Sequence, residues 1–220
     1  MVAPMEYTGR TQVGGAPQSR RLGTLTLHKL AVGSLDNNVY LLEGRDGTRL
    51  LVDAAADVQV IASQLLHSGG LDFVLTTHRH HDHWGALGEV VADTGAGTMA
   101  GAADADAIDV PTSHRLAHDD SIDLDGTELR VFGLRGHTPG GIALAFADDS
   151  GTWHILTGDS LFPGGVGRTT PETFGQLFGD VSTRIFDVYP DDTWVYPGHG
   201  WDTTLGAERP HLDEWRERGW

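Results

Sequence analysis

The chain has 220 residues, and its 31 acidic residues outnumber the 15 basic ones, which gives a formal net charge of −16. This charge argues against nucleic acid and against an anionic membrane surface as partners, because both bind to basic faces. The sequence contains no cysteine, which excludes disulfides, thiolate metal sites and a cysteine nucleophile. With neither a signal-peptide pattern at residues 1–15 nor the run of about 20 apolar residues that a membrane span needs, we expect a cytoplasmic protein.

The predicted elements begin after a polar, aperiodic segment at residues 1–21, which we interpret as a loose N-terminal arm. Short apolar runs predict strands at residues 22–30, 39–42, 49–52, 73–75, 129–132, 142–146, 153–156 and 193–196. Apolar residues at helical spacing predict helices over residues 57–68, 85–92, 171–188 and 207–218. Asp57 is the expected N-cap of the first helix, and Pro171 suits the first turn of the third.

Strands followed by helices thus occur in each half of the chain. Two sheets packed face to face, with helices on both outer faces, would use such an order. No linker or low-complexity tract separates the halves. We therefore predict an α/β protein in which residues 22–220 form one domain.

A histidine-rich loop, Thr76–Gly85, directly follows the apolar run at 73–75. His78 and His80 alternate, so both can project from one side of an extended segment, while Asp82 and His83 can face a second point nearby. Imidazole and carboxylate groups are the ligands that zinc-like metals prefer. A solvated polar loop would explain one histidine, but the pattern His-x-His-x-Asp-His at a strand end favours a metal site.

Three further candidate ligands stand beside predicted strands and next to glycine. His137 lies in Gly136–Gly141, Asp159 follows the run at 153–156, and His199 follows the run at 193–196. Glycine lets the backbone crowd around a small site. Each of these turns alone is unremarkable in sequence, but together with the histidine loop they indicate one metal centre.

These motifs resemble the metallo-β-lactamase superfamily, and within it the glyoxalase II-like branch. The resemblance extends over most of the chain. It rests on the segments Asn37–Leu42, Leu51–Asp53, His78–His83, Gly136–Gly140, Gly158–Phe162, Gly165–Arg168 and Pro197–Gly200. It implies a four-layer αββα sandwich. It also implies that His78, His80 and His137 hold one metal ion, that Asp82, His83 and His199 hold a second, and that Asp159 bridges both.

The resemblance further implies a hydrolase that cleaves a small acyl thioester or related ester with a hydroxide shared by two divalent ions. Zinc is the expected ion, with iron or manganese as alternatives. Asp82 would both bind a metal ion and accept a hydrogen bond from the nucleophile. Asp53 would contact a metal ligand without binding the metal itself. A Ser-His-Asp hydrolase is disfavoured because the sequence has no Gly-x-Ser-x-Gly elbow.

The sequence also departs from glyoxalase II. Arg168 matches the basic residue that the family places near the glutathione carboxylate, but Thr170 stands where the family has an aromatic residue. Glyoxalase II has a further C-terminal helical domain that helps to bind glutathione, whereas this sequence ends at Trp220. We therefore expect activity on simple acyl thioesters with little dependence on glutathione.

Two other functions remain open from the sequence. A mononuclear iron oxygenase of the persulfide dioxygenase type would use a facial triad of two histidines and one carboxylate, which His78, His137 and Asp159 could supply. A non-catalytic, metal-stabilised module is the third possible function, and the full set of seven ligands disfavours it.

Outside this set, we interpret His81 as pointing away from the metals, and His114 with His118 as a solvated helix end.

Overall fold

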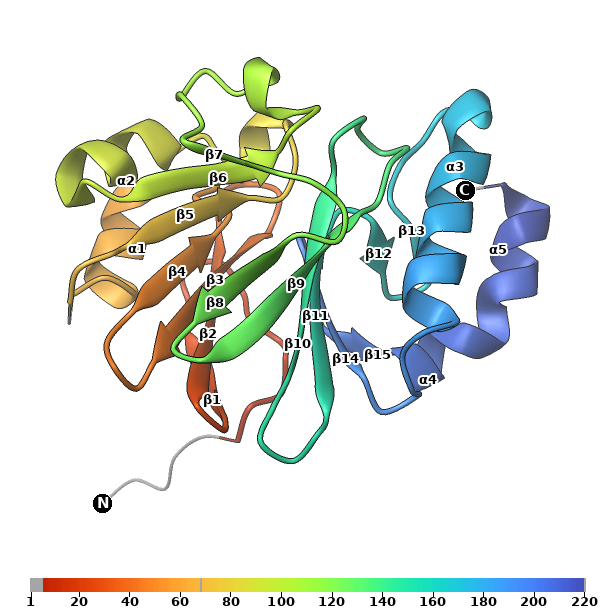
Figure 1. Cartoon of the computed structure of the whole chain (residues 1–220), viewed down its shortest axis with the longest axis horizontal. Helices are drawn as coiled ribbons and strands as arrows, with labels where there is room; N and C mark the ends of the chain where they lie inside the picture. Colours follow the sequence, from red (N-terminus) through yellow and green to blue (C-terminus); the bar gives the residue numbers. More distant parts are fainter. Residues whose placement is uncertain (1–5, 68, 220) are drawn as a thin grey trace.

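The computed structural model describes residues 6–67 and 69–219. Two sheets pack against each other in the middle of the molecule, and helices cover both outer faces (Figure 1). The layers therefore follow the order helix, sheet, sheet, helix. The α/β class and the αββα sandwich that the resemblance implies are both confirmed.

The first sheet takes its strands in chain order. They are β1 (Gln18–Leu22), β2 (Leu25–Val32), β3 (Asn37–Gly44), β4 (Arg49–Val52), β5 (Phe73–Thr76), β6 (Gly97–Gly101) and β7 (His114–Leu116). The pairs from β1 to β4 are antiparallel, and those from β4 to β7 are parallel. Parallel neighbours need crossover connections. The helices α1 (Val58–Gln64) and α2 (Leu87–Thr94) supply two of these and cover the outer face (Figure 1).

The second sheet has the strand order β15-β14-β11-β10-β9-β8. Its strands are β8 (Ser121–Leu124), β9 (Thr127–Gly133), β10 (Ile142–Ala147), β11 (Trp153–Gly158), β14 (Trp194–Pro197) and β15 (Thr203–Thr204). A separate ribbon joins β12 (Leu161–Phe162) to β13 (Gly165–Val166). The outer side carries α3 (Pro171–Val181), α4 (Leu205–Glu208) and α5 (Leu212–Arg218) (Figure 1).

Three apolar clusters hold these layers together. Successive side chains of a strand point to opposite faces of its sheet. On β3, Leu41 therefore packs toward the helical layer, and Leu42 packs between the two sheets. On the far side, Trp215 of α5 packs against the second sheet and is 1% exposed. The central strands β3 and β4 of the first sheet and β10 and β11 of the second are thus buried on both faces.

The segment predicted as a loose arm is partly ordered. Gln18–Leu22 pairs with β2, so residues 18–21 belong to the first sheet, and the predicted boundary at residue 21 is wrong. Nearer the N-terminus, the Tyr7 hydroxyl donates a 2.6 Å hydrogen bond to the Asp202 carboxylate. β1 is the edge strand of the first sheet, and edge strands often carry charged residues, which agrees with its polar sequence.

Several other boundaries also differ from the prediction. The predicted helix 171–188 continues beyond α3 only as a π-helical turn, Ser182–Phe186. The predicted helix 207–218 is interrupted because Pro210 has no N–H to donate, and a 3₁₀ turn separates α4 from α5. Asp57 does not cap α1 with its side chain, which accepts a hydrogen bond from the Gly33 N–H instead. Ser68, the predicted end of that helix, lies outside the described residues.

Besides β1, the strands that were not predicted are β6, β7, β8, β12, β13 and β15. His114 begins β7, so the interpretation of His114 and His118 as a helix end is wrong. In the described part of the chain, no helix combines the length and hydropathy that a membrane span requires.

Candidate metal centre

The seven candidate ligands meet where strands of both sheets end. His78, His80, Asp82 and His83 follow β5, and the last two of these lie in a 3₁₀ turn, His81–His83. The other three come from the second sheet: His137 lies between β9 and β10, Asp159 follows β11, and His199 follows β14. The packing of the two sheets therefore brings together side chains that are distant in the sequence.

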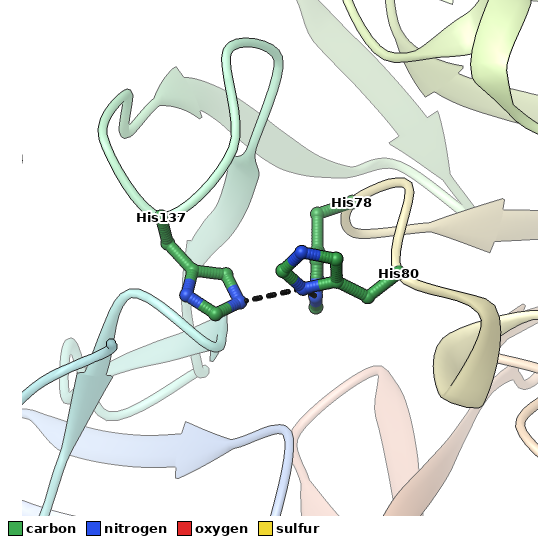
Figure 2. A group of neighbouring side chains, drawn as sticks. All are labelled: His78, His80 and His137. Atoms are coloured by element: carbon green, nitrogen blue, oxygen red, sulfur yellow. Dashed lines mark hydrogen bonds between the residues drawn. The ribbon is translucent and has the colours of Figure 1, made fainter. Parts of the chain in front are cut away.

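The first group consists of His78, His80 and His137, whose rings point toward one another (Figure 2). Nδ1 of His80 lies 3.0 Å from Nε2 of His78 and 2.9 Å from Nε2 of His137. Two nitrogens on a tetrahedral zinc ion, each about 2.0–2.1 Å from the metal, are roughly 3.3 Å apart. The three nitrogens thus have close to the spacing that a common ion would impose.

The second group consists of Asp82, His83 and His199. Nε2 of His199 lies 3.2 Å from Nε2 of His83 and 3.4 Å from Oδ2 of Asp82. The remaining pair, Nε2 of His83 and Oδ2 of Asp82, is 3.6 Å apart. Two imidazoles and one carboxylate therefore converge on a second point.

Asp159 contacts both groups. Its Oδ2 lies 3.5 Å from Nε2 of His137 in the first group and 3.4 Å from Nε2 of His199 in the second. Its Oδ1 lies 3.3 Å from Nε2 of His83, and this buried oxygen accepts no hydrogen bond from the described residues. A buried carboxylate oxygen without a hydrogen-bond donor is costly unless a cation compensates it. The donor set therefore fits divalent ions of the zinc type.

Outer contacts fix the orientation of the imidazoles. Nδ1 of His137 donates to the Arg168 carbonyl, and Nδ1 of His199 donates to the Leu35 carbonyl, each over 2.8 Å. A ring that donates from Nδ1 presents the Nε2 lone pair to the centre. His83 is oriented similarly, because its Nδ1 lies 2.8 Å from Oδ2 of the buried Asp53.

Asp53 is itself held in place by the start of the histidine loop. Its carboxylate accepts hydrogen bonds from the Thr77 N–H and the Thr77 hydroxyl, over 2.7 and 2.8 Å. Asp53 has a positive φ of 62°, a conformation that aspartate tolerates better than most residues. The loop that carries His78 is thereby tied to the end of β4.

Burial and neighbouring charge shift the pKa values of these groups in different directions. Burial lowers the pKa of His78 well below its usual range, and the nearby His83 lowers it further. Burial also opposes protonation of His83, but the Asp53 and Asp159 carboxylates outweigh it and raise the pKa of His83 to about 10. Burial alone would raise the pKa of Asp159, yet the His199 and His83 imidazoles hold it well below its usual range. Asp159 is therefore a carboxylate, as a metal ligand must be.

Sequence reasoning missed Asn37, which stands beside the second group. Its Nδ2 donates a 3.0 Å hydrogen bond to Oδ2 of Asp82. Asn37 lies within a segment that carries the family resemblance, but nothing in the local pattern shows which loop it faces. His81 is exposed and its ring packs on Trp84, away from both groups. Arg168 is also exposed and reaches the centre through its carbonyl.

The chain is similar in sequence to two hydroxyacylglutathione hydrolases. A hydroxyacylglutathione hydrolase of Rhodospirillum rubrum is 33% identical over 180 residues, which cover 81% of this chain and 67% of the relative. One from Vibrio cholerae serotype O1 is 33% identical over 165 residues, which cover 74% of this chain and 62% of the relative. The chain thus matches somewhat under two thirds of the Vibrio cholerae protein's length.

Solved structures show the same fold. The crystal structure of TTHA1623 in a di-iron-bound form has a TM-score of 0.67 and 29% identity, over 82% of this chain and 96% of that one. BLEG-1 B3 metallo-β-lactamase has a TM-score of 0.74 and 22% identity, over 85% and 98% of the two chains. The family model of the metallo-β-lactamase superfamily matches residues 32–209, which include every candidate ligand. The chain therefore belongs to the metallo-β-lactamase superfamily.

Proposed function

We propose that this protein is a binuclear metal-dependent hydrolase that cleaves a small acyl thioester or a related ester. The observation that carries the proposal is the position of Asp159, whose carboxylate contacts an imidazole of each group. A carboxylate in this position can ligate two ions and offset their mutual repulsion. The hydroxyacylglutathione hydrolases to which the chain is similar support hydrolysis of a thioester.

In this proposal each group holds one ion and Asp159 is shared. His78, His80 and His137 hold the first ion, and Asp82, His83 and His199 hold the second. Zinc is the proposed metal, because imidazole and carboxylate ligands at these spacings suit it. When bound, the two ions would lower the pKa of a water molecule toward neutrality and polarise the acyl carbonyl.

Asp82 is the residue to which we assign proton handling. Burial alone would raise the pKa of Asp82, but the hydrogen bond from Asn37 and the nearby His83 lower it, so the carboxylate stays ionised. Its side chain is 33% exposed, so water and substrate can reach it. Asn37 holds the carboxylate in one orientation, in which it can accept a proton from the attacking water.

Metal analysis and matched assays test this function against the oxygenase alternative. We expect two zinc-like ions per chain and hydrolysis of an acyl thioester such as a lactoyl or acetyl conjugate. One iron per chain, with oxygen consumption on a persulfide, would replace the hydrolase by the oxygenase.

His199→Ala separates the two functions further, because His199 belongs only to the second group. A binuclear hydrolase should lose one ion and most of its activity, whereas an oxygenase that uses His78, His137 and Asp159 should keep its iron. His211→Ala is the matched control, since His211 is 54% exposed and outside the site. A His199→Ala variant that kept wild-type hydrolysis would remove the second group from the mechanism.

A further inference from the structure

The loop after β14 carries His199, a ligand of the second group. Residues before β3 hold this loop through one set of contacts, because the Asp36 carbonyl accepts a 3.3 Å hydrogen bond from the Gly200 N–H. Residues 7–10, which we name the N-terminal strap, hold it through a second set. The family model matches residues 32–209, so the strap lies outside the part of the chain that carries the family match.

Hydrogen bonds join the strap to the end of this loop. The Asp202 N–H donates to the Gly9 carbonyl over 3.1 Å, and Oδ2 of Asp202 accepts the 2.6 Å hydrogen bond from the Tyr7 hydroxyl. The Lys29 ammonium group on β2 donates to the carbonyls of Gly9 and Gly200, one from each segment. Gly9 and the side chain of Asp202 are buried, so this contact lies inside the fold.

Glycine at position 9 allows the strap to approach the loop closely. A Cβ on Gly9 would lie 2.7 Å from both Cβ and Oδ2 of Asp202, and its φ of 71° is in the left-handed region that favours glycine. A larger residue would therefore have to move the strap away from the loop or displace Asp202. The next residue adds a cation–π contact, because the Arg10 guanidinium lies 4.4 Å from the centre of the Trp201 ring, two residues after His199.

A metal ion binds more tightly when the fold already holds its ligands in the binding conformation. The apparent Kd is the intrinsic Kd divided by the fraction of the protein in that conformation. For the second group, Nε2 of His199 must stay near Nε2 of His83 and Oδ2 of Asp82, which are 3.2 and 3.4 Å away.

The first group has no such connection to the strap. None of its three histidines lies on the loop after β14. Among the residues that the structure describes, no hydrogen bond or ion pair joins the strap to that group. A change in the strap should therefore affect the binding of the two ions unequally.

We propose that the N-terminal strap positions the loop of His199 and thereby raises the affinity of the second group for its metal ion. Tyr7 and Gly9 are positioning residues, because they act through Asp202 and contact no candidate ligand. This inference rests on the proposed function, in which the second group holds an ion. The strap would thus determine how much of the protein carries both ions when metal is scarce.

A matched pair of glycine substitutions tests the strap in the full-length protein. Gly9→Ala places a methyl group against Asp202, whereas Gly14→Ala introduces the same backbone strain, at a φ of 80°, with nothing within 4 Å of the new Cβ. Zinc titration in competition with a chromophoric chelator measures the Kd of each binding step, and His199→Ala shows which step belongs to the second group. We expect Gly9→Ala to weaken that Kd about tenfold and to leave the other Kd unchanged, and Gly14→Ala to change neither.

Tyr7→Phe is a second strap variant, in case Gly9→Ala does not fold. It removes the hydrogen bond to Asp202 but keeps the ring that packs on Trp194, and it should weaken the second Kd roughly three- to tenfold. Urea denaturation of the metal-free variants measures their overall stability. A purely structural strap would lower this stability without separating the two Kd values. Equal shifts of both Kd values, or an unchanged second Kd in both strap variants, would overturn the proposal.

Thioester turnover, measured on the same proteins, separates failure of this inference from failure of the proposed function. Two zinc ions in the wild type, a selective loss in the strap variants and no hydrolysis would refute the hydrolase and retain the strap. Hydrolysis with two ions and no selective loss would retain the hydrolase and refute the strap. A wild-type protein that binds a single ion would overturn both.

Discussion

Lys29 and Asp202 form an ion pair inside the protein, with 2.6 Å between Nζ and Oδ1 and side chains that are 0% and 1% exposed. Nζ of Lys29 also donates hydrogen bonds to the carbonyls of Gly200 and Gly9, over 2.7 and 2.9 Å. One buried ammonium group therefore joins the loop next to His199 to the N-terminal segment. Burial lowers the pKa of Lys29 and raises that of Asp202, and each partner opposes the shift of the other.

Lys29→Met should be strongly destabilising, because it leaves the Asp202 carboxylate buried without its counter-ion. Breaking a buried pair in this way costs about 3–5 kcal/mol. Urea denaturation of the metal-free protein measures the loss. Arg45→Met is the comparison, since the Arg45–Asp149 pair is exposed and such pairs contribute less than about 1 kcal/mol. A Lys29→Met loss no larger than that of Arg45→Met would contradict the role assigned to the pair.

Asp159→Asn should lower metal content and reduce kcat by orders of magnitude. The amide keeps the shape of the side chain but provides no negative charge to hold two cations together. Metal analysis and thioester turnover measure the two effects. His81→Asn should change neither, because His81 is exposed and packs on Trp84 rather than on the ligands. Loss of metal in the His81 variant with two ions retained in the Asp159 variant would invalidate the ligand assignment.

The sequence predicted the elements that have a strong local pattern. Arg49–Val52 is a strand with the predicted bounds, because its short apolar run follows a turn at residues 44–47. β6 (Gly97–Gly101) was missed because the segment Gly-Thr-Met-Ala-Gly has little strand propensity of its own. That segment becomes a strand through its pairing with β5 and β7, which are distant in the sequence.

The candidate site shows the same division between local and distant information. His78, His80 and Asp82 could be selected because they share one loop and their residue types suit a metal. Arg79 and Arg135 lie beside candidate ligands, yet nothing in their local sequence indicates that they line one cavity with Arg168. That relationship depends on the packing of the two sheets, which no local pattern encodes.

Removal of metal should abolish activity and lower the melting temperature. Ions that bind only the native ligands stabilise the fold by RT ln(1 + [L]/Kd), which is about 2.7 kcal/mol at a concentration 100 times Kd. Calorimetric scans with and without a chelator measure the shift, and added zinc should restore both properties. Full activity in protein that metal analysis shows to be empty would refute the hydrolase mechanism proposed above.

His154 should make the fold less stable in acid. Burial, followed by the Arg20 guanidinium, lowers the pKa of His154 from 6.5 to about 4, although Asp148 opposes the shift. Above pH 6.5 the imidazole is neutral in both folded and unfolded chains, so it makes no pH-dependent contribution. As the pH falls from 6.5 to 4, His154 becomes protonated in the unfolded chain but stays neutral in the folded protein. The free energy of unfolding therefore falls, by about 3 kcal/mol in total.

His154→Gln tests this contribution, because glutamine is polar but does not titrate. Tyr196, whose hydroxyl lies 2.9 Å from Nδ1 of His154, keeps a second partner in Arg20, so the substitution does not strand that hydroxyl. Urea denaturation of the metal-free proteins between pH 4 and 7 should give a flatter stability profile for His154→Gln than for the wild type. His211→Gln, at an exposed site, should follow the wild-type profile. Parallel profiles for the wild type and His154→Gln would show that the acid sensitivity of the fold has another source.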